Sequence, residues 1–136
     1  MYILDTNVIS EIRKAATGKA NPKVLAWADS ISINQLFLSS ITILELETGI
    51  LLKERNDKKQ GRVLRQWLEQ QVLTAFCGRV LGFDQQIALQ CAKFHIPNPR
   101  SYRDSMIAAT AYIHNMTVVT RNIEDFSDMG ITLINP

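Results

Sequence analysis

The sequence predicts an α/β protein in which helices cover a central, mainly parallel β-sheet. Two observations lead to this fold class. Short apolar segments rich in β-branched residues alternate with longer segments whose apolar residues recur at helical spacing. Several of the short segments are also followed by an acid or a hydroxyl that suits the start of a helix. With 136 residues and no internal repeat or linker, the chain is expected to form one domain, residues 1–136.

The first half of the chain is predicted to contain two strands and four helices. Pro22 suits a first helical turn, and Ser39–Ser40 resembles a strand end followed by a helix cap. Gly49 is unfavourable inside a helix, so we expect close packing or the close approach of a ligand there. The predicted elements are strand Tyr2–Leu4, helix Val8–Lys14, connector Ala15–Asn21, helix Lys23–Asp29, strand Leu36–Ser40, helix Thr42–Arg55 with Ile43, Leu46, Ile50 and Leu51 facing inward, polar break Asn56–Gly61 and helix Arg62–Thr74.

The second half is predicted to continue the alternation of strands and helices. Asp84 is placed to cap a helix, and Pro97 and Pro99 exclude a helix from the segment around them. Small residues recur along the helix that follows, which favours tight packing of that helix on a sheet. The predicted elements are strand Arg79–Phe83, helix Gln85–His95, loop Ile96–Tyr102, helix Arg103–Asn115 and strands Met116–Thr120 and Ile131–Ile134.

Composition places the chain among ordinary globular proteins. It is 46% hydrophobic and 21% charged, which argues against disorder, and its net charge of +2 excludes a strongly basic field over the whole surface. Any affinity for nucleic acid must therefore come from a local patch. Cys77 and Cys91 lack metal-ligand spacing, so both are expected to be reduced core residues. No signal peptide or bilayer-spanning run is visible, so we expect a cytoplasmic protein that does not bind membranes.

Four acids follow strand-like segments near the starts of helices: Asp5, Glu45, Asp104 and Asp125. In a parallel sheet these positions share one edge, where ligands bind in open α/β folds. Gathered carboxylates repel one another unless a cation lies between them, and oxygen ligands without His or Cys suit Mg²⁺ or Mn²⁺. The usual chemistry of such a site is phosphoryl transfer to water that the metal activates. Four helix-capping acids would give the same pattern, so spacing alone leaves both interpretations open.

Four sequence blocks together carry a family resemblance: LDTNVIS, SSITILELETG, RDSMIAATA and VVTRNIEDF. In this order and spacing they resemble the PIN-domain ribonucleases, and specifically VapC-type toxins of the branch that includes FitB-like and plasmid stability proteins. The resemblance runs from Tyr2 to Pro136. It implies a PIN-like three-layer α/β/α sandwich and an endoribonuclease that depends on Mg²⁺ or Mn²⁺. It also implies homodimerisation, neutralisation by a VapB-type antitoxin in a toxin–antitoxin hetero-oligomer, and contact with operator DNA only through that antitoxin.

The same blocks imply the site residues. Asp5, Glu45 and Asp104 match the family's acids, and all three are expected to be catalytic and to bind metal. Many relatives carry a further acid where this chain has Asn122, while Asp125 offers a carboxylate one helical turn on. Either Asp125 completes the site, or the site uses three acids and Asn122.

Other side chains are expected to support these acids. Thr6 and Thr120 would hold metal ligands in place through their hydroxyls, and Asn7 would fix the turn and hydrogen-bond Asp5. The RNA substrate, for which tRNA is one candidate, would be bound by basic residues: Arg13, Lys14, Arg103 and Arg121, with Lys53 and Arg100 also near the approach. The segment 53–65 carries six basic residues and two acids, and it is either a solvated face or a contact to the RNA backbone.

Three other functions compete with the metal-dependent nuclease. His95 and His114 each close a predicted helix, and no Ser-His-Asp arrangement is visible, so nucleophilic catalysis and a His-pair ribonuclease are not favoured. A catalytically inactive PIN-like module that binds RNA or protein is the main alternative. The presence of Asp5, Glu45 and Asp104 argues against it.

Overall fold

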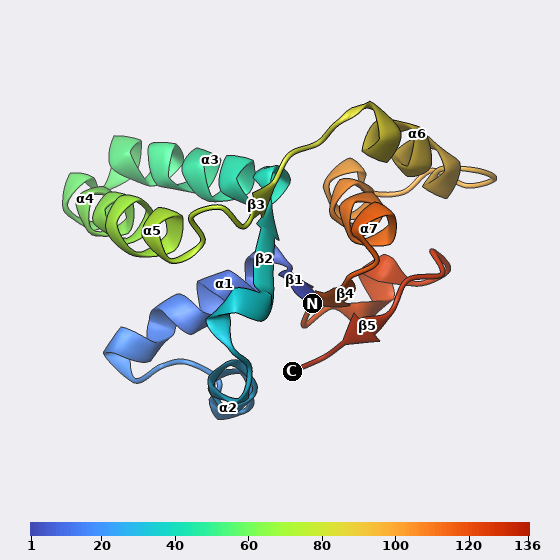
Figure 1. The fold of residues 1–136 in the computed structure, drawn as a ribbon. Helices are drawn as coiled ribbons and strands as arrows, with labels where there is room; N and C mark the ends of the chain where they lie inside the picture. The colour runs from blue at the N-terminus through green and yellow to red at the C-terminus, as the bar shows by residue number, and fades with distance from the viewer.

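Five parallel strands form the central sheet, in the order β3-β2-β1-β4-β5 (Figure 1). The structure is a computed structural model that describes all residues, Met1–Pro136. The predicted α/β fold with a parallel sheet is confirmed. The strands are β1 (Tyr2–Leu4), β2 (Leu36–Ser39), β3 (Val80–Leu81), β4 (Thr117–Val119) and β5 (Leu133–Ile134).

Helices connect most successive strands; the helix cap at Asp84 was predicted, and the cap at Asn21 was not. The Asp84 side chain accepts a hydrogen bond from the Ile87 amide, and the Asn21 side chain accepts one from the Lys23 amide. None of the helices has the length and apolar character needed to cross a membrane. The helices are α1 (Thr6–Arg13), α2 (Pro22–Ser30), α3 (Ser40–Asn56), α4 (Lys58–Gln66), α5 (Leu73–Ala75), α6 (Gln85–Phe94) and α7 (Tyr102–His114), with 3₁₀ turns η1 (Lys14–Thr17), η2 (Ile33–Gln35) and η4 (Ile123–Phe126) and the π-helical segment η3 (Trp67–Val72).

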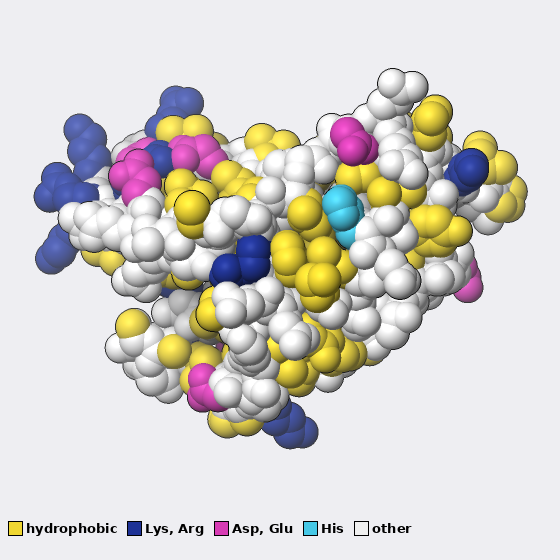
Figure 2. Space-filling view, in the orientation of Figure 1, with side chains coloured by type: hydrophobic (Ala, Val, Ile, Leu, Met, Phe, Trp, Pro, Cys, Tyr) yellow, Lys and Arg dark blue, Asp and Glu magenta, His cyan; other side chains and the backbone are white.

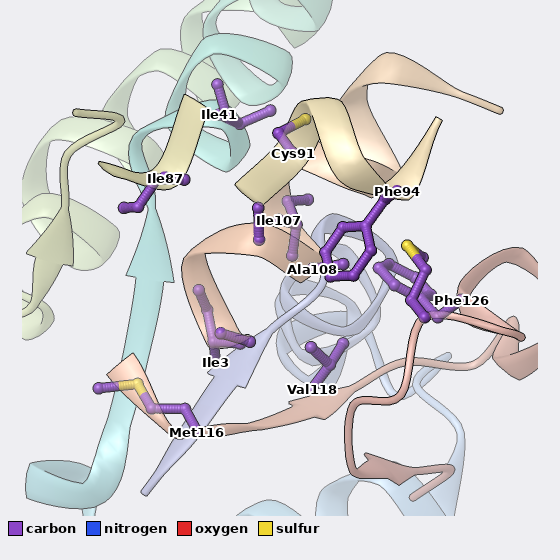
Figure 3. Close-up of a cluster of buried hydrophobic side chains, with 13 residues drawn as sticks. Ile3, Ile41, Ile87, Cys91, Phe94, Ile107, Ala108, Met116, Val118 and Phe126 are labelled. Atoms are coloured by element: carbon purple, nitrogen blue, oxygen red, sulfur yellow. The ribbon is translucent and has the colours of Figure 1, made fainter. Parts of the chain in front are cut away.

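Alternation along the strands divides the core into two layers, one on each face of the sheet. Ile3 and Val118 pack with the buried residues of α6 and α7, as Figure 3 shows. Their neighbours Leu4 and Val119 face the opposite side, where α1, α2 and the α3–α5 region cover the sheet. The result is the expected three-layer α/β/α arrangement.

Strand order fixes the position of the candidate site. The chain passes from β1 outward to β2 and β3, then returns to place β4 on the other side of β1. The segments that follow β1 and β4 therefore diverge, and a crevice forms between them at the carboxyl edge of the sheet. Asp5 directly follows β1, and Thr120 directly follows β4.

The hairpin of α3 and α4 differs most from the prediction. The expected polar break at Asn56–Gly61 is wrong, because α4 already begins at Lys58 and only Asp57 separates the helices. Gly61 makes this possible: a Cβ there would lie 2.6 Å from Glu54 Cγ and 2.8 Å from Glu54 Cα. Either close packing or the close approach of a ligand was expected at Gly49; a Cβ there would meet nothing within 4 Å, so close packing is excluded. The glycine that close packing requires is therefore Gly61.

Two predicted core residues also lie at the surface. Leu51 is 51% exposed, because the buried face of α3 runs through Ile41, Thr42, Leu46 and Ile50 instead. Cys77 is exposed in the turn after α5, whereas Cys91 is buried as expected.

Candidate active site

Asp5 is the most enclosed acid of the site, with 6% of its surface exposed. It is the N-cap of α1, and its Oδ1 accepts a hydrogen bond of 2.8 Å from the Thr6 amide. Its Oδ2 accepts one of 2.8 Å from the Thr120 hydroxyl. Burial raises the pKa of Asp5 to about 6, the charges of Asp104 and Glu45 act in the same direction, and the two hydrogen bonds oppose the rise. Asp5 is thus both a helix cap and a carboxylate whose charged form is disfavoured by burial.

Thr120 connects this carboxylate to the loop after β4. Its hydroxyl accepts hydrogen bonds from Asn7 Nδ2 at 3.4 Å and from the Asn122 amide at 3.0 Å. Asn7 Oδ1 accepts a further bond of 3.3 Å from the Arg121 amide. The expected hydrogen bond from Asn7 to Asp5 is wrong: Asn7 reaches Asp5 only through Thr120, because its amide spans the gap between α1 and this loop.

Glu45 projects from the second turn of α3 toward α1. Its Oε1 accepts a hydrogen bond of 2.9 Å from the Thr6 hydroxyl, which lies 3.2 Å from the hydroxyl of the fully buried Thr42. Its Oε2 lies 3.6 Å from Arg103 Nη1. Glu47, as expected, points elsewhere and pairs with Arg65 at 2.7 Å. Thr6 therefore links the acids that follow β1 and β2.

Asp104 lies in the first turn of α7, which Ser101 caps. Burial raises the pKa of Asp104, and the charges of Asp125 and Glu45 raise it further. Asp125, in η4, is exposed. The pKa effects link all four predicted acids: Asp5 responds to Asp104 and Glu45, and Asp104 responds to Asp125 and Glu45. The four carboxylates consequently face one region of negative potential.

The donor set of this region fits a hard divalent cation. Every predicted ligand is a carboxylate oxygen, and neither His nor Cys is among them. No group of three or more Asp, Glu, His or Cys side chains is arranged closely enough to hold a metal ion by itself. Mg²⁺ commonly binds through one or two carboxylates and keeps several waters, so an incomplete protein shell suits it. Burial is the main cause of the raised pKa values of Asp5 and Asp104, and a cation here would favour their charged forms and relieve the smaller contribution from neighbouring acids.

Some of the basic side chains predicted to bind substrate form ion pairs within the protein, and others do not. Lys14 Nζ and Arg121 Nη1 lie 3.2 and 3.0 Å from Glu11 Oε2, and Glu11 Oε1 accepts a bond of 2.8 Å from the Asn21 amide. Arg103 contacts Glu45, as described above. Arg13 makes no ion pair, and its guanidinium lies over the ring of Trp67 instead.

Sequence reasoning missed Glu11 and Thr42. Glu11 is 6% exposed and joins α1 to the loops after η1 and β4; the hydrogen bond from the Asn21 amide, together with Lys14 and Arg121, lowers the pKa of Glu11. The only local signal in the sequence for the role of Glu11 was the lysine three positions after it, at the spacing of a helical ion pair. Thr42 had none, because its contact with Thr6 depends on how α1 and α3 pack.

Basic side chains gather at a second place, around the free end of the α3–α4 hairpin in Figure 2. One of the six basic residues of segment 53–65, Arg65, is not part of this open surface. Its guanidinium contacts Glu47, Glu54 at 3.0 Å and Glu69 at 3.9 Å. The other five make no ion pair.

Comparisons with known proteins identify the family and the fold of this chain. Residues 2–131 match the family model described as PIN domain. Toxin FitB from Neisseria gonorrhoeae is 38% identical over 100% of this chain and 98% of its own length, and VapC ribonuclease Y4jK from Sinorhizobium fredii is 39% identical over 100% and 97%. The crystal structure of FitAcB from Neisseria gonorrhoeae superposes with a TM-score of 0.88, at 38% identity over 100% of this chain and 98% of that one. The structure of FitAB bound to the IR36 DNA fragment gives 0.87, at 37% identity over 100% and 95%.

Proposed function

This chain belongs to the PIN-domain family, and we propose that it is a metal-dependent endoribonuclease that acts as the toxin of a VapBC-type toxin–antitoxin pair. The names of its relatives, a toxin and a VapC ribonuclease, support this assignment. The observation that carries it is the set of four carboxylates at the crevice beside β1, in which Asp104 interacts electrostatically with Asp5, Glu45 and Asp125. Such a set is unfavourable without a function that uses its charge. Free of antitoxin, the protein would cut RNA and inhibit growth.

We propose Asp5 and Asp104 as the principal ligands of Mg²⁺ or Mn²⁺, with Glu45 and Asp125 completing the acidic pocket. The bound metal would activate water and stabilise the negative charge that develops on the phosphate. Asp125 is preferred to Asn122 as the fourth member because its charge acts on Asp104. The backbone N–H of Asn122 donates to the Thr120 hydroxyl, so Asn122 helps to hold the loop after β4.

The remaining side chains orient these acids. Thr120 fixes one oxygen of Asp5, and the Thr6 amide fixes the other, so the carboxylate plane is set before a metal arrives. Thr6 also holds Glu45, and Arg103 offsets part of its charge. We expect hydrolysis without a covalent enzyme intermediate, because the nucleophile would be a water molecule that the metal activates.

We propose that the antitoxin covers an apolar groove of about 270 Å³ on the α1 and α2 side of the sheet. Eleven of its twelve lining residues are hydrophobic, among them Ile9, Ile12, Ile31 and Phe76. The solved complex of FitAB with a DNA fragment supports a partner of this kind, with operator DNA contacted through the antitoxin. A toxin of this class acts in the cytoplasm.

We also propose that the protein forms a homodimer through α3. This helix exposes Leu44, Leu51 and Leu52, and their spacing of seven and eight residues places them on one face. Light scattering of wild type and Leu44→Glu would test this: the variant should be monomeric at concentrations where wild type is dimeric.

Cleavage of labelled structured RNAs tests the enzymatic proposal. Wild type should produce discrete cuts with Mg²⁺ or Mn²⁺ and none with EDTA. Asp5→Asn and Asp104→Asn should each abolish them, whereas Asp29→Asn, an exposed Asp on α2, should not. Cutting that survives EDTA and both site substitutions would refute the assignment. Binding of RNA without any cutting would favour the inactive-module alternative.

A further inference from the structure

A polar groove of about 640 Å³ begins at the acidic site and runs between α1, α3 and α4. Thr6 and Glu45 line it where it meets the acids, and Trp67 lines it where η3 begins. Glu45 and Lys53, which both line it, are eight residues apart on α3, or about 12 Å along the helix axis. The groove is therefore an extended channel that leads away from the reacting centre.

Gly49 keeps this groove open. It lines the groove in the middle of α3, and a Cβ there would meet no atom within 4 Å. A glycine inside a helix is unfavourable, and here no close packing compensates for it. The missing side chain therefore leaves room for a bound ligand.

The two cations along the groove are free to bind a ligand. Arg13 and Lys53 line it and make no ion pair with any carboxylate. Among the other predicted substrate cations, Lys14 and Arg121 are held by Glu11, and Arg100 donates to backbone carbonyls. Asp57 is the acid at the far side, and its side chain is occupied in capping α4.

The Arg13 guanidinium and the Trp67 ring meet where the groove reaches η3. The guanidinium carbon of Arg13 is 5.9 Å from the ring centroid of Trp67, and the ring is partly buried against the core. Trp67 is also the first residue of a π-helical segment, a local geometry that is frequent at functional sites. Cationic grooves that carry aromatic or guanidinium planes are the usual binding sites for unpaired nucleotides.

We propose that this groove binds a single-stranded segment of the RNA adjoining the scissile phosphate. Arg13 and Lys53 contact its backbone, and one unpaired base stacks on the Arg13–Trp67 pair. This inference rests on the proposed nuclease function, because a strand whose phosphate lies at the acids must leave the site through an adjoining channel. Stacking accepts any base, so the pair selects unpaired RNA over duplex without reading a sequence.

RNA binding in EDTA tests the inference without any cleavage. The probes are a short unstructured RNA and a duplex of the same sequence, both fluorescently labelled. We expect Arg13→Gln and Lys53→Gln each to weaken binding of the unpaired RNA several-fold and to reduce the salt slope by about 0.7 per cation. Lys23→Gln, on the exposed start of α2, is the matched control and should change neither quantity.

Stacking on Trp67 is tested separately. Trp67→Leu should weaken binding of unpaired RNA about tenfold, whereas Trp67→Phe should retain most of it. In a Trp27→Phe background Trp67 is the sole tryptophan, so RNA should quench its fluorescence directly. Gly49→Leu should block the groove while the helix remains intact. Thermal melts of each variant separate loss of binding from loss of folding.

The outcomes are distinguishable. Unchanged RNA affinity in folded Arg13, Lys53 and Trp67 variants would overturn the inference, and so would loss of affinity for a protein partner alone. Groove-dependent RNA binding by a wild-type protein that never cleaves RNA with Mg²⁺ or Mn²⁺ would support the groove and refute the nuclease.

Discussion

The Thr120 hydroxyl donates a 2.8 Å hydrogen bond to Asp5 Oδ2, although the two residues are 115 positions apart. Each directly follows one of two adjacent parallel strands, Asp5 after β1 and Thr120 after β4. The bond therefore spans the crevice between β1 and β4, where the strand order of the sheet reverses. It fixes a buried carboxylate whose burial otherwise favours its neutral form.

Thr120→Val should impair cleavage more than folding. The substitution removes the donor that lowers the pKa of Asp5, so this pKa should rise further above 6. Loss of a group that orients a metal ligand commonly costs about 10- to 100-fold in metal affinity or activity. Thr120→Ser keeps the hydroxyl and should retain most of the activity. Equal activity of the Val and Ser variants across pH 6 to 8 would contradict this role.

Asp5→Asn should stabilise the metal-free protein at neutral pH. Because the pKa of Asp5 is raised in the folded state, that state binds more protons than the unfolded chain between about pH 4 and pH 6. The free energy of unfolding therefore decreases as pH rises through 6, by up to about 3 kcal/mol. Asparagine carries no charge and escapes this loss. Urea unfolding in EDTA at pH 7.5 and 4.5 measures it: the gain should be large at pH 7.5 and fall to about a third of that value at 4.5.

Mg²⁺ should raise the melting temperature of wild type, and the rise should increase with the logarithm of metal concentration. The metal binds the ionised acids of the folded state and relieves their repulsion. Asp104→Asn should reduce this increment, while Glu47→Gln, whose carboxylate contacts Arg65, should preserve it. An equal increment in all three proteins would indicate that the metal binds elsewhere.

The same substitution at two glycines should have opposite effects on stability. Gly49→Ala meets open space inside α3 and should raise the free energy of unfolding by about 0.5–1 kcal/mol. Gly61→Ala would press a Cβ against backbone and side-chain atoms of Glu54 and should lower it by about 1–3 kcal/mol. Chemical denaturation of both variants measures the difference. Stabilisation by both would mean that α3 and α4 are less closely packed than described.

Arg65→Met should lower the melting temperature more than Glu47→Gln does. Arg65 bridges α4 to Glu47 and Glu54 of α3, so its loss leaves two like charges side by side. Removing Glu47 alone leaves the Arg65–Glu54 pair in place. Circular dichroism melts would measure both, and an equal effect would show that Arg65 acts on one acid only.

Local signals predicted much of this structure. Asp84 and Ser39 cap helices as expected because a cap depends on a few adjacent residues. The order of strands and helices placed Asp5 at the carboxyl edge of the sheet, and its coupling to Asp104 agrees with the expected convergence of acids. These features need no knowledge of distant contacts.

Features that depend on packing between distant segments were not predictable. Gly61 looked like part of a turn because nothing nearby in sequence shows that α4 lies against Glu54. Glu11 engages Lys14 and Arg121, so two residues expected to contact RNA are already paired within the protein. The sequence alone cannot show which basic residues form ion pairs with acids of the same protein.

Trp67 lines both the apolar groove that we assign to the antitoxin and the polar groove that we assign to RNA. One indole ring is thus a shared wall between two ligands that need not touch each other. If antitoxin binding shifts that ring and weakens RNA binding by some factor, RNA must weaken antitoxin binding by the same factor. A high concentration of RNA substrate would then weaken antitoxin binding, so the release of the toxin would depend on the amount of RNA present.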